Sequence, residues 1–315
     1  MLLPCKMQER LKFNITREQF VEYARIAANF DTCLTDYTPK WNYLDPLADH
    51  CAIATCAAQD IFGGDLYRFS LEGHEGFRKG DSHYKLIHPL DNPDKPFDPT
   101  FEQFHGHYPW GLEKTAVIRE RSYTLNPIRY PDSVRRYKLF SLRLANVRVE
   151  GNPLFLDTRY QECFFQALDS PCKKMRFGCK AMRDGEFVAG EANFTLLEPE
   201  KRNECKDWCV RLNIRSRTKQ QLGACGHAER WTWKSLLREE IDPHDCELFV
   251  VGIYGLGNGL PYIKEKAQFS CPQCAKQITE AGFKAVNMPV VNRWVRVPTC
   301  EIMDQANEYI KELGS

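Results

Sequence analysis

One histidine and two cysteines, each at the start of an expected helix, constrain how the second half of this chain can fold. The stretch CGHAERWTW contains His227, and SCPQC contains Cys271 and Cys274. A C-x-x-C pair in the first turn of a helix lets both sulfurs point to one spot, and the free N–H groups there favour thiolates. Zinc takes four ligands, and a catalytic zinc keeps one of the four positions for water. One imidazole and two thiolates would fill the other three. If these residues share one metal ion, the fold must bring two distant helix starts together.

The pattern around these residues predicts strands that alternate with helices. Asp184-Gly185 sits in the middle of an alternating stretch and is a strong signal for a β-hairpin. The apolar run CELFVVGIYG reads as a buried strand. The expected elements are a helix over 159–168, a hairpin over 178–194, a helix from 227 to 237, a strand over 246–255, a helix over 271–283 and a strand over 284–291. This order predicts an α/β fold, a three-layer α/β/α domain over residues 151–315.

The first half predicts a separate α+β domain over residues 1–150. Helices are expected over 16–30, 51–64 and 131–147, with short strands between the last two. The last of these helices carries several basic residues between apolar ones, and a solvated face is the expected role for them. A new pattern begins after EGNPLF, so we place the domain boundary near residue 150.

The composition limits where the protein can be located and which partners it can bind. A chain of 315 residues with a net charge of only +1 lacks the basic excess of proteins that grip long nucleic acids. No apolar run is long enough to span a membrane, and Pro4 and Lys6 interrupt the N-terminal apolar stretch. We therefore expect a cytoplasmic protein with no membrane partner. Its 14 cysteines, several in close pairs, then suggest metal ligands or catalytic thiols.

Glu229, two residues after His227, completes a known signature. H-x-E followed by a C-x-x-C is the zinc deaminase pattern, and this chain has HAE and SCPQC in that order. With the hairpin DGEFVAGEANF before them, residues 155–290 resemble the cytidine/deoxycytidylate deaminase superfamily. Ser270 stands where the family has proline, a departure that removes a rigid approach to Cys271 but no ligand.

The resemblance implies a function and a set of site residues. It implies Zn²⁺ held by His227, Cys271 and Cys274, with Glu229 as the catalytic proton shuttle. It also implies that the Asn193 side chain and the Ala228 backbone amide contact a cytosine-type base. The near-neutral charge favours a free nucleotide or nucleoside as substrate, and nucleic acid, either tRNA or single-stranded DNA, is the alternative. Oligomers are common in this superfamily, so a homo-oligomer is compatible with it.

Three other interpretations of these residues remain open. The His-Cys-Cys group could be a structural zinc knot, which usually has four protein ligands and needs no glutamate. A second, structural zinc could lie at Cys205, Cys209 and Cys225. In the deoxycytidylate-like branch, the basic stretch before the histidine lies near the nucleotide phosphate, where Arg211 or Arg215 could bind; a solvated loop is the alternative.

The first domain contains a second candidate site. Cys51 is at an expected helix start, His83 is on an expected strand, and Asp98 follows, which is the chain order of papain-like thiol enzymes. In that scheme Cys51 attacks, His83 takes its proton and Asp98 orients the imidazole. The alternative function of the whole protein is then a thiol hydrolase with the deaminase-like domain as a binding module. A buried Cys51, packed as a small apolar group, is the structural interpretation; Cys56, one turn further on, is expected in the core.

A resemblance also covers this first domain. CAIATCAAQDIFGGDL, SHYKLI, FDPTFEQF and the stretch from RERSYTLNPIRY onward are similar to the bacterial YunG-like family over residues 15–147. This resemblance supports a domain of its own and implies no activity.

Overall fold

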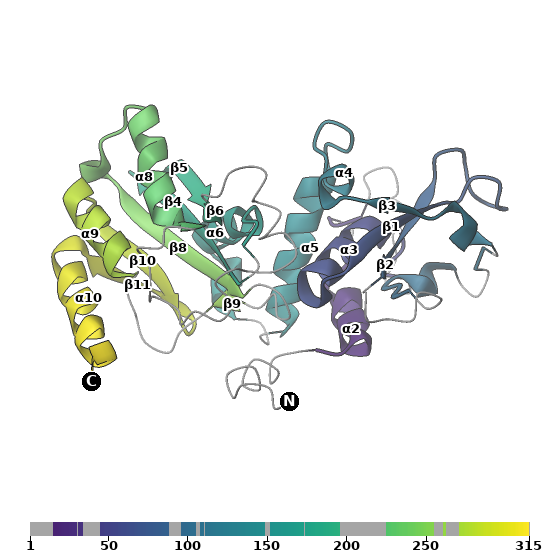
Figure 1. Ribbon diagram of the computed structural model, residues 1–315, viewed down its shortest axis with the longest axis horizontal. Coiled ribbons are helices and arrows are strands. Elements are labelled where there is room, and N and C mark those ends of the chain that lie inside the picture. The colour runs from purple at the N-terminus through teal and green to yellow at the C-terminus, as the bar shows by residue number, and fades with distance from the viewer. Residues whose placement is uncertain are drawn as a thin grey trace. The chain divides into compact units, whose positions relative to one another are not determined.

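The computed structural model describes residues 15–29, 31–33, 45–87, 96–104, 108–109, 111–148, 152–172, 174–195, 225–254, 261–262 and 271–314. The chain divides into two compact units: residues 1–150 with 256–259, and the rest of residues 151–315. Each unit has its own sheet and its own helices (Figure 1). The mixed α/β class predicted from the sequence is confirmed.

The first unit packs helices against a small antiparallel sheet. Strand β1 lies in the middle, with β2 and β3 on either side. Helix α3 contacts β1, β2 and α5, so it lies between the sheet and α5. Thr16 and Gln19 form a capping box that starts α2. The elements are α2 (Arg17–Ala27), α3 (Cys51–Phe62), β1 (Asp65–Ser70), β2 (Ser82–Ile87), η2 (Phe101–Phe104), η3 (Leu112–Thr115), β3 (Val117–Arg119), α4 (Arg121–Thr124) and α5 (Ser133–Arg148).

Helix α5 corrects one expectation from the sequence. Its basic residues were expected on a solvated face, but Arg136 is only 5% exposed. The Arg136 guanidinium donates to the carbonyl oxygens of Thr32, at 3.0 Å, and Asp49, at 2.9 Å. Arg143 donates to the carbonyl oxygen of Ala27 at 2.7 Å. The expectation is wrong for Arg136 because its charged end satisfies loop carbonyls that would otherwise be buried without a donor.

The second unit is built on one larger mixed sheet in the order β11-β10-β8-β4-β5, with β9 also paired to β8. Strands β8 and β10 run parallel, and the other pairs of this sheet are antiparallel. The elements are η4 (Pro153–Leu156), α6 (Thr158–Leu168), β4 (Met175–Arg183), β5 (Glu186–Ala192), β6 (Phe194–Thr195), β7 (Cys225–Gly226), α8 (Ala228–Arg238), η6 (Pro243–Asp245), β8 (Glu247–Tyr254), β9 (Pro261–Tyr262), α9 (Pro272–Ala281), β10 (Ala285–Val290), β11 (Arg293–Pro298) and α10 (Thr299–Gly314). Strand β11 and helix α10 follow the last element that the sequence predicted.

The predicted hairpin joins β4 to β5. Asp184 and Gly185 both have positive φ, 53° and 87°, as a two-residue type I′ turn requires. Asp184 tolerates this region better than most non-glycine residues, and Gly185 adopts it freely. The Asp-Gly signal therefore identified the turn correctly.

Alternate residues of β4 face opposite helices. Cys179 and Ala181 belong to the core cluster that also contains residues of α8, α9 and α10. Their neighbours face α6: the Lys180 ammonium lies 3.0 Å from the Glu162 carboxylate of that helix. The sheet of this unit is thus covered by α6 on one face and by α8, α9 and α10 on the other (Figure 1).

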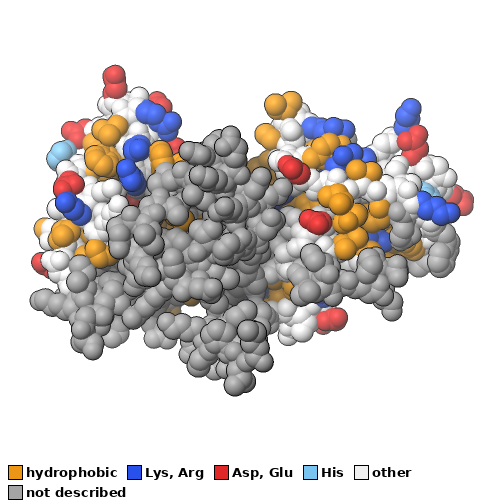
Figure 2. Space-filling model, viewed as in Figure 1, with side chains coloured by type: hydrophobic (Ala, Val, Ile, Leu, Met, Phe, Trp, Pro, Cys, Tyr) orange, Lys and Arg blue, Asp and Glu red, His pale blue; other side chains and the backbone are white. Residues whose placement is uncertain are grey.

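The surface in Figure 2 carries charges of both signs. Lys and Arg side chains alternate with Asp and Glu over the described part of the visible face, with apolar patches between them. Among the residues described, no helix has the length and apolar character needed to cross a membrane.

The close approach of α6 to β4 gives a stability prediction. A Cβ added at Gly178 would lie 2.1 Å from the Cys163 carbonyl oxygen and 2.5 Å from the Ala167 nitrogen, both in the α6 backbone. Gly178→Ala must therefore push the helix away from the sheet, and we expect it to lower the free energy of unfolding by about 1–3 kcal/mol, as overpacking does. Urea denaturation measures this change.

Gly190→Ala is the matched control for this prediction. Gly190 pairs with Lys180 on the neighbouring strand, and an added Cβ there would meet only the flexible Lys180 side chain. We expect a change of less than about 0.5 kcal/mol, the usual range for surface substitutions. Equal losses in the two variants would contradict the argument from backbone contact.

Candidate functional site

His227 lies between a short strand and a helix. It follows β7 and is the N-cap of α8, with an extended backbone at φ −83° and ψ 148°. Gly226, just before it, packs against the Trp231 ring so closely that an added Cβ would lie 2.0 Å from the indole nitrogen. Trp231 in turn stacks on Phe194 at a centroid distance of 4.4 Å. This packing fixes the backbone that carries the imidazole.

The two cysteines lie at the start of α9. Cys271 is its N-cap, and its Sγ accepts a hydrogen bond from the backbone N–H of Cys274 at 3.4 Å. Pro272 occupies the first turn, where its missing N–H costs nothing. Both cysteine side chains are buried, at 7% and 1% exposure. The helix start therefore holds both sulfurs on the same side.

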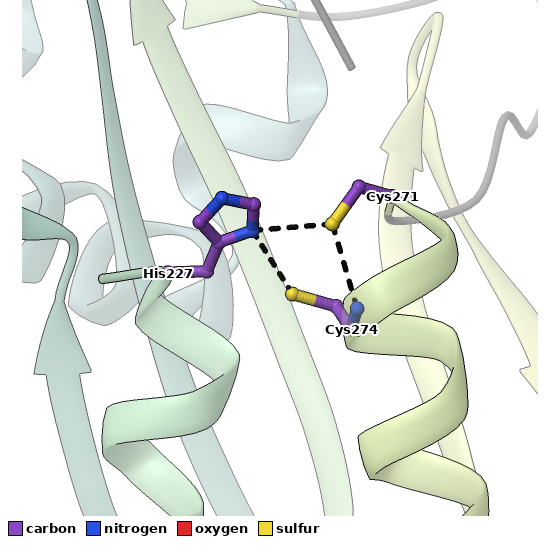
Figure 3. Close-up of side chains that lie close together, drawn as sticks. All are labelled: His227, Cys271 and Cys274. Atoms are coloured by element: carbon purple, nitrogen blue, oxygen red, sulfur yellow. Dashed lines mark hydrogen bonds between the residues drawn. The ribbon is translucent and has the colours of Figure 1, made fainter. Parts of the chain in front are cut away.

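The three side chains converge as the sequence predicts (Figure 3). The Nδ1 atom of His227 lies 3.2 Å from the Cys271 sulfur and 3.1 Å from the Cys274 sulfur. All three potential ligand atoms lie within 4.8 Å of one another, so this group could hold a metal ion. Within the described ranges it supplies three ligands, and a tetrahedral ion would keep a fourth position.

The two thiols respond oppositely to their shared surroundings. A hydrogen bond from Cys274 lowers the pKa of Cys271, burial opposes this, and His227 lowers it further, to about 4. The pKa of Cys274 is raised, by its hydrogen bond to Cys271, by burial and by the negative charge of Glu229. The two sulfurs thus share one proton, which stays on Cys274 while Cys271 is a thiolate. A cation at this point would replace that proton and stabilise both thiolates.

Glu229 lies beside this group. It is in the first turn of α8 and is only 8% exposed. Its carboxylate affects the pKa of Cys274 both by its charge and by a hydrogen bond, which places it next to that sulfur. A carboxylate in this position can exchange protons with a group bound at the three ligands.

The two residues expected to contact a base have different surroundings. The Asn193 Oδ1 accepts from the backbone N–H of Phe177 at 2.5 Å, and its Nδ2 donates to the Met175 carbonyl at 3.0 Å. This side chain therefore joins the end of β5 to β4. Ala228 is fully buried and is the first residue of α8, where a backbone N–H lacks an intrahelical acceptor.

Several other sequence predictions fall outside the structure. Cys205 and Cys209 of the expected second zinc site, and also Ser270, Arg211 and Arg215, lie outside the described residues. Cys225 is described; it is a half-buried cysteine on β7, where it pairs with Thr195.

The first unit brings together the residues of the second candidate site. Cys51 is the first residue of α3, and His83 is on β2. The His83 Nε2 lies 2.7 Å from the Asp98 Oδ2, with both side chains buried. Cys51 and His83 line the same cavity of about 550 Å³. Cys56, also on α3, is fully buried, as expected, and burial raises the pKa of its thiol to about 12.

Sequence reasoning missed Gln103. Its Nε2 lies 3.0 Å from the His83 Nδ1 and 3.0 Å from the Thr100 hydroxyl. Asp98 also accepts from the Thr100 backbone at 3.1 Å, so one turn carries both contacts of the imidazole. The segment DPTFEQF has an acid and an amide on either side of a short turn. Their role becomes recognisable only when β2 is known to place His83 beside them.

Two buried histidines of this unit have opposite pKa shifts. For His83, burial lowers the pKa, but the Asp98 charge and hydrogen bond oppose it and Cys51 adds to them, so the pKa rises to about 9. For His50, burial dominates and lowers the pKa to about 4. His50 is the N-cap of α3, and its ring contacts the Thr32 hydroxyl at 2.9 Å and the Ala48 carbonyl at 2.7 Å.

Comparison with known families agrees with one of the two resemblances. Residues 16–147 match the family of the YunG protein, which confirms the resemblance of the N-terminal half. The match covers less than half of the chain and ends before the second unit begins. A search of curated proteins finds no match.

Metal binding tests the His-Cys-Cys group directly. We expect the purified chain to retain about one zinc ion after dialysis. Cys271→Ser and His227→Ala should each weaken zinc binding at least about tenfold, because each removes a ligand. Bound zinc is measured by elemental analysis.

Cys300→Ser is the control for zinc binding. Cys300 is an exposed cysteine of the same unit, outside the group, and its loss should leave the zinc content unchanged. Unchanged zinc in Cys271→Ser would show that the ion binds elsewhere.

The histidine pair gives a pH prediction. Because the folded-state pKa of His83 lies above its ordinary 6.5, its charged ring stabilises the fold below about pH 6.5, and this contribution disappears as the pH rises through about 9. The lowered pKa of His50 has the opposite sign: the fold loses stability as the pH falls from 6.5 toward 4. NMR titration of the ring resonances should show His83 charged and His50 neutral at pH 7. A neutral His83 at that pH would contradict the pairing with Asp98.

Proposed function

We propose that this protein is a zinc-dependent hydrolytic deaminase that acts on a cytosine-type base of a free nucleotide or nucleoside. The observation that supports it most is the meeting of the His227 Nδ1 with the Cys271 and Cys274 sulfurs, with the Glu229 carboxylate beside Cys274. The order H-x-E and C-x-x-C agrees with the zinc deaminase signature. A sheet covered by helices on both faces is compatible with a deaminase-like domain over residues 151–315.

The donor set fits zinc. Imidazole nitrogen and thiolate sulfur are the ligands that zinc favours, whereas magnesium and calcium take oxygen ligands. The lowered pKa of Cys271 keeps one sulfur ready as a thiolate. Among the described residues three side chains form the group rather than four, which favours a catalytic over a structural role.

The proposed reaction uses the chain's residues as follows. When bound, zinc supplies a Lewis acid that lowers the pKa of a water toward neutrality. Glu229 would accept a proton from the attacking water and deliver it to the ring nitrogen of the base, while the water oxygen bonds to C4. Glu229 then carries the second proton to the departing amino group, the C4–N bond breaks, and ammonia leaves. Because Glu229 is buried, it exchanges protons within the site rather than with bulk water.

Ala228 and Asn193 are the proposed contacts to the base. The backbone N–H of Ala228, at the start of α8, can donate to a carbonyl oxygen of the ring. The Asn193 oxygen and one of its amide hydrogens are engaged with β4, which leaves one hydrogen for a substrate. Asn193 would thus contact substrate with a side chain that the sheet already orients.

Charge favours a small substrate over a polymer. The whole chain carries a formal charge of +1, and the face in Figure 2 has acidic and basic side chains interspersed. A polynucleotide-binding surface would concentrate Lys and Arg along one path. Deamination of tRNA or single-stranded DNA is the alternative.

Glu229→Gln tests the proposal. The variant keeps all three ligands, so we expect zinc to stay bound while turnover falls by at least about 10² to 10⁴, the usual contribution of a positioned acid or base. Ammonia release is measured with cytosine and adenine nucleosides, nucleotides and oligonucleotides. Glu239→Gln, an exposed residue at the end of the same helix, is the matched control and should retain activity.

Two outcomes would count against this function. Zinc bound in the wild type without ammonia release from any cytosine compound would favour a structural metal site. Activity on oligonucleotides alone, lost as salt rises from about 50 to 200 mM, would favour the polynucleotide alternative.

A further inference from the structure

We propose that the first unit contains a second catalytic site, in which Cys51 and His83 carry out acyl transfer from a small amide or ester to water. This inference does not depend on the metal group of the second unit, because every residue that lines the cavity belongs to the first. The site consists of a nucleophile on α3, an acid-base group on β2 and two groups that orient it.

The cavity supplies room for a substrate. Its volume of about 550 Å³ is within the range of small-molecule sites, which are about 300–1,000 Å³. Cys51, His83 and Gln103 all line it. The walls are mostly apolar, and Tyr84, Arg129 and Arg136 are among the residues that line them. This volume favours a small acyl compound as the substrate class.

The nucleophile lies where a carbonyl oxygen can be stabilised. Cys51 is the first residue of α3, so the backbone N–H groups of its first turn lack intrahelical acceptors. Cys51 and Ala52, two residues of that turn, both line the cavity. These N–H groups point the positive end of the helix toward the oxygen that becomes negative during attack.

The imidazole is held from both nitrogens. Nε2–H donates to the Asp98 carboxylate at 2.7 Å, and Nδ1 lies 3.0 Å from Gln103. Cys51 contributes a hydrogen bond and a charge effect to the same ring, which places the thiol beside it. His83 is 1% exposed, so its orientation is fixed by these groups rather than by water. Asp98 and Gln103 are positioning residues, and Cys51 and His83 are the catalytic pair.

The proposed steps balance. In the reactive form the Cys51 proton is already on His83, so the pair is a thiolate and an imidazolium; the sulfur bonds to the substrate carbonyl carbon, and the carbonyl electron pair moves to oxygen. When that pair returns, the bond to the amine or alcohol breaks, and His83 gives its proton to the leaving group. Water then attacks the thioester carbon while His83 takes one of its protons; the C–S bond breaks, the sulfur leaves as the thiolate beside the charged ring, and the acid is released. The only co-reactant is water.

Two other cysteines, Cys56 and Cys300, serve as controls that distinguish a catalytic role of Cys51 from a purely structural one. Cys56 is on the same helix but is fully buried, and burial raises its pKa to about 12. Cys300 is exposed and, like Cys51, lies at a helix start, in the first turn of α10. Cys51 differs from both because it is half-buried and beside a histidine.

The first experiment is alkylation of the full-length protein with limiting iodoacetamide at pH 7, followed by peptide mass mapping. An ordinary thiol is only a few per cent thiolate at this pH, so a thiol paired with an imidazolium reacts up to about 30-fold faster. We expect Cys51 to react at least about tenfold faster than Cys300, and Cys56 not to react. Since Cys300 also starts a helix, the difference isolates the effect of His83. A Cys51 rate equal to or below that of Cys300 would overturn the proposal.

The second experiment measures acyl transfer with 4-nitrophenyl acetate. We expect a burst of nitrophenol, an acetyl group on Cys51 by mass spectrometry, and loss of both in Cys51→Ser. Cys300→Ser should keep the burst. His83→Asn should slow acylation by at least about 10²-fold with the fold retained by circular dichroism, and Gln103→Ala, which removes only a positioning group, should slow it less. Acetylation of other residues with Cys51 untouched would overturn the proposal, and neither result depends on ammonia release.

Discussion

The contact between the His227 Nδ1 and two cysteine sulfurs is the interaction on which the second unit's chemistry depends. Three groups that compete for protons lie within hydrogen-bond distance of one another in a largely buried place. Without a cation one sulfur stays protonated, because the hydrogen bond to Cys271, burial and the negative charge of Glu229 raise the pKa of Cys274. A divalent ion relieves this competition because it takes all three lone pairs at once. The arrangement is therefore better explained as a ligand set than as core packing.

The topology of the sheet explains why two helix starts meet there. Strands β8 and β10 are parallel, and each is preceded by a helix, α8 and α9, packed on the same face. Helix α8 contacts β4 and β5, and α9 contacts α8. Each of the two helices leads into one of the parallel strands, so both helices begin toward the carboxyl ends of those strands. That end of a parallel pair is where α/β folds bind ligands. The first unit places its own chemistry differently, with the nucleophile at a helix start and the imidazole on an antiparallel strand.

The sequence predicted local features better than non-local ones. Asp184-Gly185 identified its turn because a type I′ turn has local requirements, and the His227 and C-x-x-C pattern identified its helix starts for the same reason. Gln103 was missed because its partner His83 comes from another element. The buried role of Arg136 was missed because its acceptors are backbone carbonyls, which carry no sequence signal. Strand β11 was missed because its exposed arginines interrupt the alternation of apolar and polar residues that marks a strand. Helix α10 was missed because it follows β11 without a loop that would mark its start.

The anchoring of α3 has a consequence for how this unit tolerates change. Arg136 binds the main chain at Thr32 and Asp49, and the His50 ring binds the main chain at Ala48, so much of what fixes the start of α3 does not depend on which side chains those positions carry. Substitutions at Ala48 can accumulate without moving Cys51, provided that the backbone keeps its path. At Asp49, where φ is 60°, the left-handed backbone favours Asp, Asn or Gly. The sequence before Cys51 can therefore vary and change the shape of the cavity wall. Meanwhile Arg136 on α5 keeps the start of α3, and with it the Cys51 thiol, in place.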